Sequence, residues 1–188
     1  EILRCLVGSE MCIRDRIEKG RSELEYIDSV LDTVSRAESE RELAQIREEL
    51  TEQGYLRKQK GKQRPQAALP PLEFTSSDGF KILVGRNNTQ NDKLTLKIAN
   101  KNDMWLHTKD IHGSHTVVFA EGREISDTAI LEAAQLAAYY SKARESSQVP
   151  VDYTLVRYVS KPSGARPGMV IYVNNKTVYV TPKANISK

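Results

Sequence analysis

The sequence predicts an α+β fold in which a mostly antiparallel sheet packs against helices and follows an antiparallel helical hairpin. Apolar residues early in the 188-residue chain recur at intervals of three and four, as on one face of a helix. Asp78-Gly79 lies between two apolar segments, which is a strong β-hairpin signal. Further strand-like segments come later with helices inserted irregularly, and this order is typical of the α+β class.

Two helices are predicted before the sheet. The second begins at Ser39, which forms a capping box with Glu42, and ends at Gly54. The short loop at 36–39 predicts an antiparallel hairpin, and narrow apolar stripes are typical of a coiled coil. The stripes are Leu24, Ile27, Leu31 and Val34 in the first helix and Leu43, Ile46 and Leu50 in the second. We interpret residues 17–56 as the end of a longer coiled-coil region.

Residues 1–16 differ from the rest of the chain. They lack the helical pattern that begins after them and resemble translated adaptor DNA, so we interpret them as a non-native segment. Both cysteines, Cys5 and Cys12, lie there. The remaining residues include no cysteine, which agrees with a cytoplasmic protein that has neither disulfides nor thiolate metal sites. No run of about 18 apolar residues predicts a membrane span.

Positive charge is concentrated in the C-terminal part. Residues 17–73 contain 10 basic and 12 acidic residues, whereas residues 74–188 contain 15 basic and 10 acidic residues. Residues 57–73 form a predicted linker with several prolines. Its basic run consists of Arg57, Lys58, Lys60, Lys62 and Arg64. This charge distribution permits a polyanionic partner for the domain at 74–188.

The domain at 74–188 is predicted to start with the β-hairpin around Asp78-Gly79. A polar, turn-rich segment at 85–92 and a short helix at 94–99 come next. A strand, a glycine-containing turn and a second strand are expected between Asp103 and Phe119. A helix then runs from Ser126 or Asp127 to about Ala143, and its many alanines allow close packing on a sheet. The last strands are expected at 153–158, 169–173 and 177–180.

The turn of the strand–turn–strand segment gathers rare residues. The only tryptophan and all three histidines lie within 105–115. They are Trp105, His107, His112 and His115, with Asp103 and Asp110 nearby. Three imidazoles and a carboxylate could bind zinc, although the spacing matches no familiar zinc signature. The same imidazoles also suit a phosphate backbone, so the residues alone leave both interpretations open.

Two further loops suit phosphate contact. Lys161 and Arg166 lie in a loop rich in glycine and proline that ends at Gly168, and such a loop can present backbone N–H groups to an anion. Arg86 with Asn87 and Asn88 offers a guanidinium fork and two amides. A plain strand connection and a plain turn explain the same residues.

Nucleophilic catalysis has little support. Ser114 lies between Gly113 and His115, but the segment lacks the second glycine and the strand-to-helix turn of a nucleophile elbow. We therefore predict that the chain is not an enzyme and carries no cofactor.

Four separated motifs together resemble the C-terminal RNA-binding domain of the NFACT family. They are Gly85-Arg86-Asn87-Asn88 with Asn91-Asp92, Asp103-Met104-Trp105-Leu106-His107-Thr108, Gly113-Ser114-His115, and Lys161-Pro162 with Gly164 and Pro167-Gly168. This family includes bacterial fibronectin-binding protein A-like proteins and the eukaryotic nuclear export mediator factor. Residues 26–31 and 46–55 are similar to the end of the family's coiled-coil region, so the resemblance extends from Ile17 to the end.

The resemblance implies a part of a ribosome quality control factor. Such factors bind large ribosomal subunits with a stalled nascent chain and recruit alanyl-tRNA, so that a C-terminal tail is added without a message. The implied partners are the large ribosomal subunit, tRNA and ribosomal RNA, in the cytoplasm and away from membranes. A fibronectin-binding adhesin, suggested by the older family name, and a metal-dependent enzyme at His107, His112 and His115 remain the alternatives.

The resemblance also implies a set of RNA-facing residues. These are Arg86, Asn87, Asn88, His107, His112, Ser114, His115, Lys161 and Arg166. Asp103, Trp105, Gly113 and Gly168 are expected to support them structurally, and no metal ligand is expected.

Overall fold

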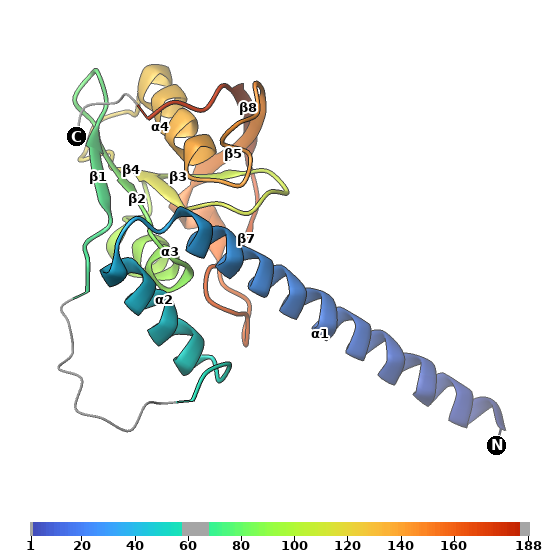
Figure 1. The fold of residues 1–188 in the computed structure, drawn as a ribbon. Coiled ribbons are helices and arrows are strands. Elements are labelled where there is room, and N and C mark those ends of the chain that lie inside the picture. Colours follow the sequence, from blue (N-terminus) through green and yellow to red (C-terminus); the bar gives the residue numbers. More distant parts are fainter. Residues whose placement is uncertain (1, 58–67, 185–188) are drawn as a thin grey trace.

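The computed structural model describes residues 2–57 and 68–184, with side chains described from residue 12 onward. A six-stranded antiparallel sheet lies between α4 on one face and α3 on the other (Figure 1). The helices α1 and α2 form a hairpin on the α3 side, and α1 extends away from the sheet. The predicted α+β class and the helical hairpin are therefore confirmed. No helix in the described ranges combines the length and apolarity needed to cross a membrane.

The second helix of the hairpin begins and ends where the capping residues predict. Helix α1 spans Ile2–Arg36, and α2 spans Glu40–Glu52 with Ser39 as its N-cap. Gly54 has a φ of 84°, and the amides of Gly54 and Tyr55 donate to the carbonyls of Thr51 and Leu50. This pattern is a Schellman motif, in which a left-handed residue closes the helix. Because α1 begins at Ile2, the helix also runs through the segment that showed no helical pattern.

Most of the predicted apolar stripe of α1 is exposed in this structure. Leu24, Leu31 and Val34 are exposed, whereas Tyr26 and Val30 are 1% and 5% exposed. These two pack with Ile46 of α2 in a small core of their own. Ile27 of the stripe is half-buried and packs against this core, so the buried face overlaps the predicted stripe at that residue only.

The sheet consists of short strands joined in the order β1-β2-β4-β3-β5-β8. Each neighbouring pair is antiparallel. The hairpin predicted around Asp78-Gly79 joins β1 to β2, and Gly79 has a φ of 80°. The strands are β1 Leu72–Thr75, β2 Lys81–Val84, β3 Met104–Thr108, β4 Thr116–Val118, β5 Val149–Leu155 and β8 Lys176–Val180.

Helix α4, Asp127–Tyr139, covers one face of the sheet. Its N-cap is Ser126, as predicted. The alanines at 129, 133, 134, 137 and 138 are fully buried against alternate strand residues such as Ile82 and Leu106. The helix ends four residues earlier than predicted, because the chain turns to pair with the histidine loop. There Ser141 bridges Gly113, and the Lys142 amide donates to the His112 carbonyl.

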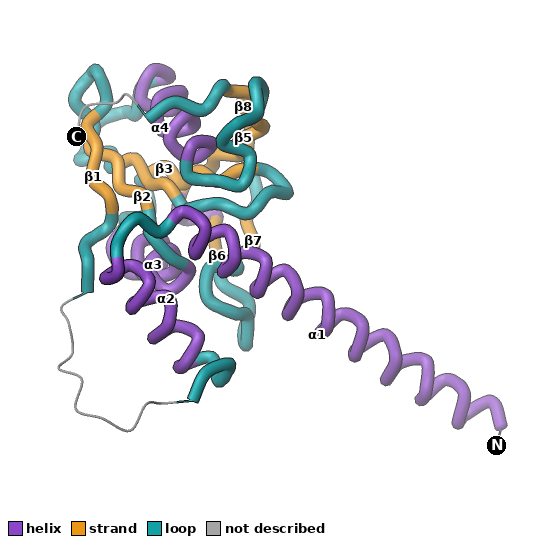
Figure 2. Tube along the Cα trace, viewed as in Figure 1, coloured by secondary structure: helices purple, strands orange, loops and turns teal. Residues whose placement is uncertain are grey.

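The other face is covered by shorter elements, seen beside the helical hairpin in Figure 2. The predicted turn-rich segment at 85–92 is helical from Asn88, because α3 spans Asn88–Lys93, and the predicted short helix at 94–99 is a π-helical turn, η1, at Leu94–Ile98. The 3-10 turn η2, Val156–Tyr158, leads into the small pair β6, Val159–Ser160, and β7, Ile171–Tyr172. These elements bury Leu94, Trp105 and Val117 in a second core. The strand predicted at 153–158 is thus shifted toward the N-terminus, and that at 169–173 is shorter.

Candidate functional site

Four aromatic rings form the centre of the second core. Trp105 in β3 is fully buried, and its ring stacks on His107 with centroids 5.8 Å apart. His115 meets the indole edge-on at 5.2 Å, and Tyr172 lies at 4.8 Å. Trp105 was expected to be a structural residue, and it lies wholly in the core. The histidine segment is therefore first of all a packing element.

The two inner imidazoles meet edge-on with centroids 5.4 Å apart, and each is also held by another protein group. The Nδ1 atom of His115 lies 2.8 Å from Thr95 Oγ1, and His107 Nε2 lies 3.3 Å from the Gly113 carbonyl. His112 is half-buried at the turn. Within residues 2–57 and 68–184, no group of three or more His, Cys, Asp or Glu is arranged to hold a metal ion. The zinc interpretation of the three histidines has no geometric support.

Burial makes the two inner imidazoles sensitive to acid. Burial lowers the pKa of His115 well below its ordinary value, and the nearby His107 lowers it further. Burial also lowers the pKa of His107. Both rings therefore stay neutral in the folded chain at a pH where the unfolded chain, with histidine pKa values near about 6.5, binds protons.

We expect the contribution of His107 and His115 to the free energy of unfolding to be constant above about pH 7. The free energy of unfolding should fall as the pH drops through about 6.5, because only the unfolded state then binds protons at these two residues. Denaturant titrations between about pH 7.5 and 5.5 measure this slope. His115→Gln removes one of the two groups, so its slope should be shallower than that of the wild type. If the wild type and His115→Gln show equal slopes, His115 is not one of the groups that make stability depend on pH.

Three residues that were expected to be structural make close contacts within the protein. The Asp103 carboxylate accepts from the amides of Ala120 and Asn100 at 2.9 and 2.7 Å, and so ties together both ends of the β3–β4 region. A Cβ at Gly113 would lie 2.8 Å from Thr108 Oγ1, and one at Gly168 would lie 2.6 Å from Asn88 Oδ1. The glycines therefore allow a close approach between parts of the protein itself.

The asparagines and the serine predicted to face RNA are buried. Asn87 accepts from the Gln90 amide as the N-cap of α3, and Asn88 Nδ2 donates to Ser29 Oγ of α1 at 2.9 Å. Ser114, which is 2% exposed, accepts from Arg36 of α1 at 3.2 Å. These three residues and the equally buried His115 are satisfied inside the protein, which argues against the predicted direct contact with RNA.

The predicted cations pair with carboxylates and carbonyls. Arg86 forms an ion pair with Glu42 of α2 and donates to the Pro70 carbonyl at 2.9 Å. Arg166 reaches Gln53 at 3.2 Å and Glu23 at 3.8 Å. Lys161 forms an ion pair with Asp92 of α3. Arg86 and Arg166, from two separate predicted loops, thus both contact the helical hairpin.

The contacts between the hairpin and the sheet domain form a polar joint. We define the hairpin joint by the pairs Arg36–Ser114, Arg86–Glu42, Asn88–Ser29, Thr89–Glu49 and Arg166–Gln53. At its centre Glu49, 3% exposed, accepts from Tyr26 Oη at 3.0 Å and from the Thr89 amide and hydroxyl at 2.9 and 3.0 Å. Sequence reasoning missed this carboxylate, because Glu49 lies among other glutamates of a polar helix.

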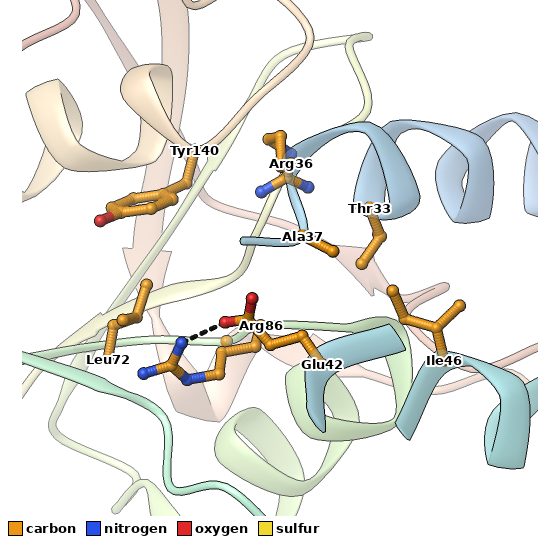
Figure 3. A pocket seen from close by; sticks show the side chains of 9 residues that line it. Thr33, Arg36, Ala37, Glu42, Ile46, Leu72, Arg86 and Tyr140 are labelled. Atoms are coloured by element: carbon orange, nitrogen blue, oxygen red, sulfur yellow. Dashed lines mark hydrogen bonds and ion pairs between the residues drawn. The ribbon is translucent and has the colours of Figure 1, made fainter. Parts of the chain in front are cut away.

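A small recess, partly open to solvent, lies at this joint. Figure 3 shows Arg36, Arg86 and Tyr140 around it, with Arg86 paired to Glu42. Arg36 is paired with Asp32 at 2.7 Å. Because both guanidinium groups have carboxylate partners, the recess has little positive charge left for an anionic ligand.

A different set of cations is exposed. We name Lys93, Lys97, Lys101 and Arg157 the basic strip; all four side chains are exposed, and none forms an ion pair with the described residues. The chain has no acidic residue between Asp92 and Asp103, and none after Asp152. These two acid-free stretches are the sequence signal that the motif-based interpretation overlooked.

Comparisons with known proteins match both parts of the chain. The family described as the NFACT protein RNA binding domain matches residues 71–174, and the family described as the NFACT N-terminal and middle domains matches residues 8–68. A relative named Rqc2 homolog RqcH from Bacillus subtilis (strain 168) is 48% identical over 181 residues, which is 95% of this chain and 31% of that protein. A protein of the same name from Streptococcus suis (strain 05ZYH33) is 45% identical over 88% of this chain and 30% of its own length.

A solved structure has the same fold. The C-terminal part of the fibronectin/fibrinogen-binding protein from Streptococcus suis is 41% identical and matches with a TM-score of 0.87, covering 93% of this chain and 70% of that chain. The chain spans about a third of the length of the curated relatives that it matches.

Proposed function

Because this chain belongs to the NFACT family, we propose that it is the RNA- and ribosome-binding part of a ribosome quality control factor. In this proposal the whole factor acts in the cytoplasm, binds large ribosomal subunits that carry a stalled nascent chain, and recruits alanyl-tRNA for C-terminal tailing. The chain contributes binding and carries out no chemical step itself. The name shared by the relatives and the RNA-binding description of the matched family support the proposal.

We assign one role to each of the segments predicted from the sequence. We propose that residues 17–56 are the end of a coiled coil, that 57–73 are a linker, and that 74–188 are the RNA-binding domain. The exposed stripe of α1 supports the coiled coil, because Ile17, Leu24 and Leu31 recur every seven residues and are 49%, 67% and 60% exposed. Helices in a coiled coil bury such a seam against a second helix.

The observation that carries RNA binding is the unpaired positive charge of the sheet domain. The basic strip has no carboxylate partner among the described residues, and the chain after Asp152 contains cations but no acids. Unpaired lysines and arginines attract RNA phosphates and release their counterions on binding. Unpaired positive charges would gain no favourable contact from an apolar partner.

We expect the chain to bind a tRNA transcript with an affinity that falls roughly 10- to 100-fold between about 50 and 200 mM salt, as three or four phosphate contacts predict. Fluorescence anisotropy with labelled tRNA over a salt series measures this dependence. Purified large ribosomal subunits in a sedimentation assay provide the second ligand. If neither RNA binds at low salt, the RNA-binding proposal for this chain is wrong.

Fibronectin is the alternative partner, because the structurally similar Streptococcus suis protein is named for binding it. Immobilised fibronectin in the same salt series separates the two proposals. RNA binding without fibronectin binding would remove the adhesin alternative, and the opposite result would favour it.

A further inference from the structure

We propose that the basic strip, and not the loops that carry Arg86, Lys161 and Arg166, is the surface that contacts the phosphodiester backbone of RNA. This inference rests on the proposed RNA-binding function and assigns it a location. It replaces the surface expected from the four sequence motifs, whose residues make contacts within the protein.

The strip follows one continuous path along the surface. Lys93 ends α3 and Lys97 lies in η1, four residues later, so their side chains leave the same side of the helical segment. Lys101 lies in the following turn. The Arg157 amide donates to the Lys101 carbonyl at 3.3 Å, which places the beginning of η2 next to that turn. The two segments that carry the four cations therefore meet where Arg157 lies next to Lys101.

The cations of the basic strip differ from those in the sequence motifs because they have no carboxylate partner among the described residues. Arg86, Lys161 and Arg166 each have a carboxylate within ion-pair distance, contributed by Glu42, Asp92 and Glu23. A phosphate that approached one of these cations would have to compete with the carboxylate already there. Lys93, Lys97 and Lys101 have no such competitor in the described structure, so the attraction of each for a phosphate remains undiminished.

The end of the strip also offers groups that suit nucleobases. The Arg157 guanidinium lies 5.9 Å from the ring of Tyr158, which is 38% exposed. Asn100 and Asn102 are exposed beside Lys101, and Asn102 accepts a hydrogen bond from Arg157. An exposed tyrosine next to a guanidinium can stack on an unpaired base. This end of the strip therefore suits a looped or single-stranded part of a structured RNA.

The basic strip lies on the same side of the sheet domain as the helical hairpin. It belongs to the α3–η1 side of the sheet, opposite α4, and the beginning of α3 contacts α2 through Thr89 and Glu49. RNA bound along Lys93–Lys101 would thus lie on the same helical segment that holds the hairpin. In the rest of the described surface, Lys142, Arg144 and Lys183 are exposed near α4 and serve as a comparison set.

The test compares two triple variants that lose the same charge. Lys93→Gln, Lys97→Gln and Lys101→Gln together neutralise the strip, whereas Lys142→Gln, Arg144→Gln and Lys183→Gln neutralise the α4 side. All six side chains are exposed, so both variants should keep the wild-type thermal unfolding midpoint. Binding is measured with a tRNA transcript and with purified large ribosomal subunits over a salt series.

We expect the strip variant to bind roughly tenfold or more weakly at about 100 mM salt, with a salt slope smaller by about three. The α4-side variant should change the Kd by less than about twofold. A loss with tRNA alone, with subunits alone or with both supports the strip and identifies the RNA that it contacts.

Two results would overturn the assignment. If the wild type binds RNA and the strip variant binds equally well, the strip is not the contact surface, although the proposed function stands. If both triple variants lose affinity equally, the attraction depends on net charge and not on this surface. Absence of wild-type binding to either RNA would instead refute the proposed function itself.

Discussion

Replacing Trp105 with alanine is expected to lower the free energy of unfolding by about 3–5 kcal/mol, the range for large aromatic residues cut back to alanine in a packed core. The side chain is fully buried and lies against His107, His115 and Tyr172. Its removal leaves a cavity that the surrounding strands cannot close, because β3 is held on both sides by β4 and β5. Urea titration followed by circular dichroism measures the loss.

Trp105→Phe is the matched control. The indole Nε1 atom is buried and has no hydrogen-bond partner in the described part of the chain, so phenylalanine removes an unsatisfied polar atom as well as some volume. We expect it to cost well under half of the alanine value. An alanine variant as stable as the phenylalanine variant would show that the four-ring cluster contributes little to stability.

Replacing Glu49 with alanine is expected to weaken the hairpin joint by about 2–4 kcal/mol. The change leaves the Tyr26 hydroxyl and the amide and hydroxyl of Thr89 without their acceptor, and each unsatisfied buried donor costs about 1–3 kcal/mol. The Tyr26 hydroxyl remains a donor at every relevant pH, because burial and the nearby carboxylate raise its pKa. Amide hydrogen exchange in α2 and in the C-terminal part of α1 measures the opening of the joint.

Glu48→Ala provides the comparison for this variant. Glu48 neighbours Glu49 in α2 but is exposed, so its removal changes the same helix and the same charge without opening the joint. We expect exchange rates within about twofold of the wild type for Glu48→Ala and far faster exchange for Glu49→Ala, with the β-sheet core unchanged in both. Equal behaviour of the two variants would mean that the hairpin is held by its apolar contacts alone.

Local signals predicted much of the fold. The turn at Asp78-Gly79, the caps at Ser39 and Ser126 and the C-terminal stop at Gly54 all act within a few residues, so a single sequence contains the information for them. The alanine-rich face of α4 could be recognised for the same reason, because helical spacing alone places those residues on one side.

The buried face of α1 could not be predicted in this way. Its most regular apolar stripe contains Leu24 and Leu31, yet the helix buries Tyr26 and Val30, which pack with Ile46 of α2. Which of two faces is buried depends on tertiary partners, and the periodicity of one helix does not include them.

The residues of the candidate site also could not be interpreted without knowing their tertiary partners. An arginine that pairs with a carboxylate and one that contacts a phosphate have the same sequence signature. The partners that decide the matter are distant in the chain: Glu42 is 44 residues from Arg86, and Arg166 meets the Glu23 carboxylate and the Gln53 amide, of which Gln53 is 113 residues away. The acid-free stretches that contain the basic strip can be found by counting, but the second of them also contains Lys161 and Arg166, which pair with distant carboxylates.

Because α1 is long, a small rotation at the hairpin joint would move the far end of the helix by a large distance. Residues 17–36, the part of α1 that we interpret as native, extend for about 30 Å. A rotation of about 10° at the C-terminal end, where Arg36 reaches Ser114, would swing Ile17 through roughly 5 Å, about one helical turn of travel. Small adjustments among a few polar pairs are thereby magnified into displacements on the scale of a nucleotide.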